Sequence, residues 1–161
     1  MRRPARFVAA CLVAAAVGVP LTTGTATAAT GSQYDYTDPA ATGCSGNAIT
    51  YWSKNLLNPA NGAVTGVVEL RYSRTCQTNW VRVNNYVGGA VAEKIIVRPR
   101  TLLPQGGSLD YAQDVTDDAL TGYSYGLQFY APAGVCVEVG GVIRLNGVVV
   151  GNNGQTFDLV C

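Results

Sequence analysis

Short runs of β-branched and aromatic residues, separated by turns rich in glycine and asparagine, constrain the fold of this chain most strongly. In Val64–Ser73, Val68 and Leu70 fall on one face, whereas Glu69 and Arg71 fall on the other. Alternation with this period is typical of a half-buried strand. Short strands at close spacing predict an all-β domain, a small sandwich or a partly open barrel of antiparallel strands.

Segments with strand-like composition cover most of the chain. Ile49, Trp52 and Leu56 also fit a helical spacing, but their segment is rich in strand-forming residues. Gly140-Gly141 is interpreted as a hairpin turn, and the acidic segment 110–118 as a helical turn. Strands are predicted at residues 48–57, 64–73, 78–87, 93–100, 123–130, 135–139, 142–145, 148–150 and 157–160.

The first 28 residues have the pattern of a secretory signal peptide. Basic residues Arg2, Arg3 and Arg6 precede an apolar run, Phe7–Val19, and the small residues Ala26-Thr27-Ala28 follow it. We expect cleavage after Ala28, which leaves one secreted domain at 29–161. The apolar run is too short for an ordinary membrane span, so we expect none after cleavage.

Two other readings of this segment are weaker. The letters before Cys11 fit a lipoprotein box, but the apolar core follows Cys11 instead of preceding it. Arg2-Arg3 also suggests twin-arginine export, although the surrounding residues fit general secretion better. Loss of the three arginines leaves eight basic against ten acidic residues, a net charge of about −2.

Four cysteines remain after removal of the signal: Cys44, Cys76, Cys136 and Cys161. An even number in an exported chain predicts two disulfides, and four cysteines allow three pairings. We favour Cys44–Cys76 and Cys136–Cys161, because neighbours along the chain bridge hairpin layers most simply. A site that binds metal through all four thiolates is disfavoured, since no CxxC pair is present.

Histidine is absent, and this excludes several chemistries at once. Without imidazole there is no ordinary Ser-His-Asp catalysis, no His metal ligand and no His-activated cysteine nucleophile. A net charge near zero gives no electrostatic reason for nucleic-acid binding. We expect no cofactor.

Two segments carry a family resemblance. Residues 38–44 read DP-x-x-T-G-C, and residues 69–83 read E-L-R-Y-S-x-x-C-x-T-x-W-x-R-V. In order and spacing they resemble the YjfA-type family of small secreted bacterial proteins, over about residues 35–85. The resemblance implies export from a Gram-positive bacterium and brings no particular chemistry with it. The second half of the chain, with Cys136 and Cys161, departs from that pattern.

Arg71, Trp80 and Arg82 are the first candidate binding residues. If their strands pair, the two arginines flank Trp80 on one sheet face, an arrangement common in recognition surfaces. A purely structural Arg–Trp stack, with Glu69 paired to Arg82 across the strands, is the competing interpretation.

Carboxylates and tyrosines form two further groups. Clustered carboxylates can hold calcium, with Asp117-Asp118 as the best pair, or hydrolyse glycosides, but a solvated acidic loop is the simpler interpretation. Exposed tyrosines can bind sugar or protein, although β-propensity also accounts for them. The acidic residues are Asp35, Asp38, Asp110, Asp114, Asp117 and Asp118, and the tyrosines are Tyr34, Tyr36, Tyr123, Tyr125 and Tyr130.

Taken together, these features predict a secreted, non-catalytic domain that binds a protein or a wall polymer at the cell surface or outside. Two alternatives stay open. One is a small secreted hydrolase that uses carboxylates. The other is a protease-inhibitor-like scaffold that presents the loop at residues 104–108.

Overall fold

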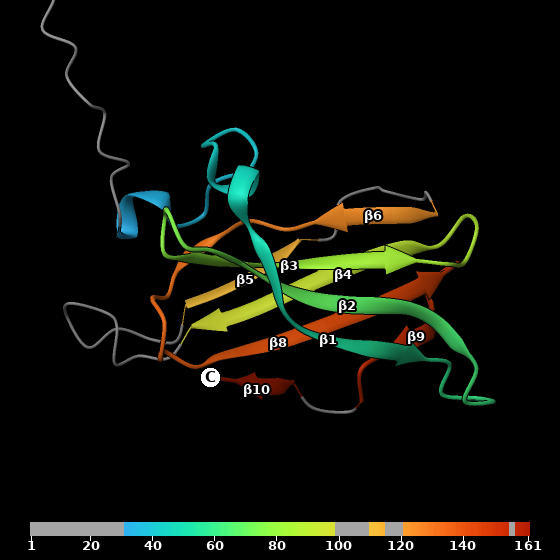
Figure 1. The fold of residues 1–161 in the computed structure, drawn as a ribbon. Coiled ribbons are helices and arrows are strands. Elements are labelled where there is room, and N and C mark those ends of the chain that lie inside the picture. Colours follow the sequence, from blue (N-terminus) through green and yellow to red (C-terminus); the bar gives the residue numbers. More distant parts are fainter. Residues whose placement is uncertain (1–30, 99–109, 115–120, 155–156) are drawn as a thin grey trace, which may run out of the picture.

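Ten antiparallel strands and two short 3-10 helices make up the part of the chain that a computed structural model describes, residues 31–98, 110–114, 121–154 and 157–161 (Figure 1). The strands join in a barrel-like, nearly closed sheet in the order β5-β4-β8-β9-β1-β2-β3-β6, with β7 beside β3 and β10 beside β8. The elements are η1 (Ser32–Tyr34), η2 (Cys44–Asn47), β1 (Ile49–Leu57), β2 (Val64–Ser73), β3 (Thr78–Asn85), β4 (Val91–Arg98), β5 (Asp110–Asp114), β6 (Gly122–Tyr125), β7 (Phe129–Tyr130), β8 (Val137–Leu145), β9 (Val148–Asn152) and β10 (Asp158–Val160).

The first three strands form the predicted meander. β1 pairs with β2, and β2 pairs with β3 from Gly66↔Asn85 to Ser73↔Thr78. Val68 and Leu70 are almost completely buried, as their alternation predicts. β6 and β7 extend this group beyond β3.

The second group of strands centres on β8. β4 lies on one side of β8, and β9 and β10 follow each other along its other side. Only one residue pair, Leu57↔Asn152, joins the two groups through β1 and β9. The core fills the space between the groups and comprises Leu56, Val68, Leu70, Val81, Val83, Ala90, Ala92, Ile96, Phe129, Ala131, Val137, Val139, Ile143 and Val160.

The all-β class and the disulfide framework are confirmed. Cys44 is bonded to Cys76 and Cys136 to Cys161, which is the pairing favoured from the sequence. Within the described residues, no helix has the length and apolar character needed to cross a membrane. The predicted signal peptide, 1–28, lies outside the described residues.

Gly140-Gly141 is not a hairpin turn, contrary to prediction, because β8 runs through both glycines. A Cβ at Gly140 would approach the Phe157 ring within 2.5 Å, and one at Gly141 would approach Val68 Cβ within 2.9 Å. The glycines therefore let neighbouring side chains pack closely on a strand.

Two other predictions need correction. Asp110–Asp114 is the strand β5, paired with β4, and not a helical turn; residues 115–118 lie outside the described part. The predicted strand 123–130 is two short strands, β6 and β7, which pair with different ends of β3. In both segments, pairing with a neighbouring strand decides the secondary structure, and the local composition does not indicate that pairing.

Candidate binding site

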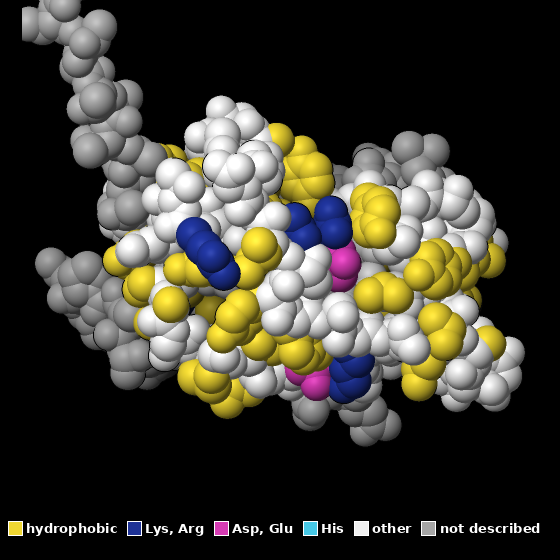
Figure 2. Space-filling model, in the orientation of Figure 1, with side chains coloured by type: hydrophobic (Ala, Val, Ile, Leu, Met, Phe, Trp, Pro, Cys, Tyr) yellow, Lys and Arg dark blue, Asp and Glu magenta, His cyan; other side chains and the backbone are white. Residues whose placement is uncertain are grey.

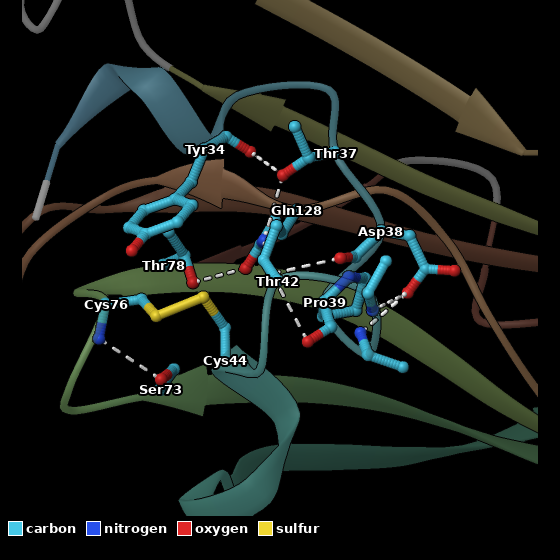
Figure 3. Close-up of a disulfide and its surroundings, with 12 residues drawn as sticks. Tyr34, Thr37, Asp38, Pro39, Thr42, Cys44, Ser73, Cys76, Thr78 and Gln128 are labelled. Carbon is cyan, nitrogen blue, oxygen red and sulfur yellow. Dashed lines mark hydrogen bonds between the residues drawn. A yellow bond between two sulfur atoms is a disulfide. The ribbon is translucent and has the colours of Figure 1, made fainter. Parts of the chain in front are cut away.

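The segment 31–48, called the lead-in below, first packs beside β7 and then, from about Pro39, crosses the outer face of β2 and β3. The Asp38 carboxylate accepts hydrogen bonds from the backbone N–H groups of Ala40 at 2.6 Å and Ala41 at 3.1 Å. The backbone N–H of Ser45 donates to the carbonyl of Pro39 at 2.9 Å. These bonds fold the DP-x-x-T-G-C motif into a compact turn (Figure 3).

A disulfide and a buried amide attach the lead-in to the sheet. The Cys44–Cys76 bond joins it to the β2–β3 turn, and both cysteines are buried. Gln128 accepts a hydrogen bond from the Thr78 hydroxyl at 2.7 Å. Its amide nitrogen donates to the hydroxyls of Thr37 at 2.9 Å and Thr42 at 2.7 Å (Figure 3). Because Gln128 is fully buried, these bonds are shielded from water and fix the lead-in in place.

Arg71, Trp80 and Arg82 lie on the sheet face that the lead-in crosses. Arg71 on β2 is directly opposite Trp80 on β3, and Arg82 is opposite Tyr125 on β6. Trp80 is only 3% exposed, although its side of β3 faces away from the core. The lead-in covers it.

These side chains and the lead-in enclose a cavity of about 170 Å³ that we call the arginine cleft. Trp80 forms part of its apolar lining, and the serine hydroxyl and the guanidinium groups supply the polar part. In the space-filling view, dark-blue basic groups adjoin a magenta acidic group, with yellow hydrophobic side chains on both sides (Figure 2). The cleft is lined by Pro39, Ala40, Ser45, Arg71, Trp80, Arg82 and Tyr125.

One carboxylate partly balances the two guanidinium groups. Glu69 accepts a hydrogen bond from Nε of Arg82 at 2.5 Å, the cross-strand ion pair proposed above. Arg71 donates to the Thr50 hydroxyl and to the carbonyl of Ala48. Burial, and then the nearby Arg82, lower the pKa of Arg71 from its usual value, while Glu69 opposes the shift. The cleft therefore keeps a net positive charge of one.

An exposed tyrosine extends this surface along β6. The Arg82 guanidinium lies 4.4 Å from the centroid of the Tyr123 ring, a cation–π contact. Tyr123 is 62% exposed and Tyr125 41% exposed. Two residues apart on one strand, they project on the same side.

The acidic candidates do not converge where the structure describes them. Asp35 pairs with Arg98 at 2.7 Å and accepts from the backbone N–H of Tyr130, while Asp38 is used in the lead-in turn. No group of three potential metal ligands occurs among the described residues. The calcium pair Asp117-Asp118 and the inhibitor-like loop 104–108 lie outside them.

Sequence reasoning missed the role of Gln128. Its partners are 50 to 91 residues away along the chain, so no local pattern indicates them. The roles of Pro39 and Ser45 in the wall of the cleft were missed too, although both lie in or next to the motif DP-x-x-T-G-C. That motif was the only signal available for this wall.

Comparisons with known proteins agree with the resemblance found in the sequence. Residues 32–122 match the family described as Protein of unknown function (DUF2690). The chain is 38% identical over 68 residues to the uncharacterized protein YjfA of Bacillus subtilis (strain 168). These 68 residues cover 40% of this chain and 43% of the relative. The chain thus spans less than half the length of that relative. No solved structure matches.

Proposed function

Because this chain belongs to the DUF2690 family, whose description names no activity, we propose a function from the geometry of the molecule itself. We propose that residues 1–28 direct export and that the domain at 29–161 binds a protein or a wall polymer, without catalysis. Binding takes place at the cell surface or outside.

The arginine cleft is the observation that carries this proposal. It combines two guanidinium groups, a desolvated Trp80 and a rim of exposed tyrosine. Arginine and aromatic side chains are the residue types that contribute most to binding energy at recognition sites. The lead-in wall is fixed by the disulfide and by Gln128, so little conformational freedom has to be lost on binding.

Export is supported by two independent features. The first is the charged, apolar and small-residue pattern at the start of the sequence. The second is the pair of disulfides, which form and persist in oxidising environments outside the cytoplasm.

Retention on purified cell walls and on immobilised culture-fluid proteins tests the proposal. The protein is recovered from culture medium with both disulfides formed, and an unrelated secreted β-domain of similar charge serves as the control. We expect retention well above the control on one of the two materials. Equal retention of both proteins on both materials would refute the binding function.

A further inference from the structure

We propose that the arginine cleft binds one singly charged oxyanion of an anionic wall polymer, and that the adjoining sugar or polyol unit packs on the tyrosines of β6. This inference rests on the proposed binding function and names its ligand class. Four features of the cleft support it.

The first feature is donor capacity. Each guanidinium group has five N–H donors. Arg71 uses Nη1 and Nη2 in its bonds to Thr50 and Ala48, and Arg82 uses Nε in its bond to Glu69. Both arginines therefore retain N–H groups for a further acceptor, and the Ser45 hydroxyl lies in the same cavity.

The second feature is charge. Two guanidinium groups and one carboxylate leave one positive charge, which matches a ligand group with one negative charge. A phosphodiester and a carboxylate both carry that charge, and both occur as repeating groups on polymers. A doubly charged group would leave one charge uncompensated at a partly desolvated site.

The third feature is the size and partial burial of the cleft. A cavity of about 170 Å³ admits a small group and no folded element of a partner. Trp80, which is 3% exposed, gives one side of the cavity a buried aromatic wall, and hydrogen bonds to charged groups are stronger in such partly buried surroundings than in water.

The fourth feature favours a polymer over a protein. A ligand that leaves the cleft along β6 passes Tyr125 and then Tyr123, whose exposed rings are suited to sugar rings or polyol chains. The remaining lining residues, Pro39, Ala40 and Ser45, are small. A stable protein interface buries about 800 Å² on each partner around large anchoring side chains. The narrow row formed by the cleft and the two tyrosines offers few such side chains.

Charge substitutions in the cleft give opposite results and so test the proposal. With purified Gram-positive cell walls as the probe, we expect Arg71→Gln to weaken binding about tenfold or more, because a charged hydrogen bond is lost. Glu69→Gln is expected to strengthen it roughly threefold, because a repelling carboxylate is removed. Loss of the folded cleft cannot strengthen specific binding, so Glu69→Gln, checked for folding by circular dichroism, remains informative even if Arg71→Gln folds poorly.

Arg74→Gln is the matched control. Arg74 is exposed in the β2–β3 turn, and its substitution changes the net charge by the same amount outside the cleft. We expect less than a twofold effect because salt screens exposed charges. Equal effects of Arg71→Gln and Arg74→Gln, or no effect of Glu69→Gln, would overturn the cleft as the site.

Two treatments of the walls distinguish the sources of the oxyanion. Hydrofluoric acid removes phosphodiester-linked polymers, and carbodiimide amidation neutralises carboxylates. Loss of binding after the first identifies a phosphodiester, and loss after the second identifies a carboxylate. Binding that survives both treatments, or binding to culture-fluid proteins alone, refutes this inference and leaves the proposed binding function standing. A protein that binds neither walls nor proteins refutes both.

Discussion

In each of the two strand groups, a disulfide and a buried side-chain amide attach a further segment to the sheet. The two attached segments lie in different places. In the group built on β1–β3, Cys44–Cys76 and Gln128 attach the lead-in to the outer face of the sheet. In the group built on β8, Cys136–Cys161 and Asn153 attach β10 to the edge of the sheet.

Asn153 shows the difference most clearly. Its carbonyl oxygen accepts from the backbone N–H of Gly141 at 3.0 Å, and its nitrogen donates to Val139 and to Asp158. All of its partners belong to β8 or β10, so the amide closes a sheet edge and creates no recess. Gln128 instead joins a sheet to a segment that lies across it, and the arginine cleft forms between the two. The first anchor thus forms the arginine cleft by holding an irregular segment over a sheet face, whereas the cavity beside the second disulfide is lined by Cys161 and the turn at 131–135 without an arginine.

Removal of each disulfide is the strongest way to break this comparison. Cys44→Ala/Cys76→Ala and Cys136→Ala/Cys161→Ala are each expected to lower the free energy of unfolding by about 3.5 kcal/mol, because the two loops are of similar length. Urea denaturation followed by tryptophan fluorescence measures both. Retention on cell walls, measured where each variant is folded, should fall for the first pair alone.

One outcome of the same experiment would contradict this division of roles between the disulfides. If Cys136→Ala/Cys161→Ala also abolished retention while remaining folded, the cleft would depend on both groups and the proposed division would be wrong. Wild-type protein measured in parallel provides the control.

Substitution of the two buried amide side chains should have an intermediate effect on stability and on wall binding. Gln128→Met leaves the buried Thr78 hydroxyl without its acceptor, and Asn153→Leu does the same to the N–H of Gly141. Each should cost about 1–3 kcal/mol of unfolding free energy, the penalty for an unsatisfied buried group. Retention on walls should decrease for Gln128→Met and stay at the wild-type level for Asn153→Leu. Equal retention of the two variants would show that the lead-in does not need Gln128.

The surface ion pair between the groups should have the smallest effect. Lys54 on β1 contacts Asp158 on β10 at 2.8 Å, with side chains 45% and 26% exposed. Lys54→Met should lower the free energy of unfolding by about 0.2–1 kcal/mol, as for other exposed pairs. Urea denaturation at low and high salt should show the difference from wild type shrinking as salt rises. A loss above 2 kcal/mol would mean that the junction of the groups depends on this pair.

Much of the first strand group could be predicted from sequence because its signals are local. Alternation in residues 68–72 and 79–83 assigned each side chain to the correct face, and that assignment placed Arg71, Trp80 and Arg82 together. The turn at 58–62 separates two strands, as the Asn-Pro and Asn-Gly pairs indicate.

The failures concern contacts between distant segments. Gly140-Gly141 resembles a turn until Phe157 and Val68 are seen to occupy the space that side chains would need. The segment at 110–114 is a strand because it pairs with the free edge of β4, and its own residues do not indicate this pairing. The wall of the cleft was likewise unpredictable, because Gln128, which holds it, is 86 residues from Thr42 along the chain.

The order of the disulfides bears on how the protein acquires them. After Cys11, the first cysteine is bonded to the second and the third to the fourth, so the two covalent loops neither overlap nor enclose each other. In the export that we propose, the chain emerges with its amino end first, and Cys44 and Cys76 meet the oxidant before Cys136 appears. Oxidation in the order of emergence therefore produces the native bonds directly. Such a protein can mature outside the membrane without the slow thiol–disulfide exchange that interleaved pairings require.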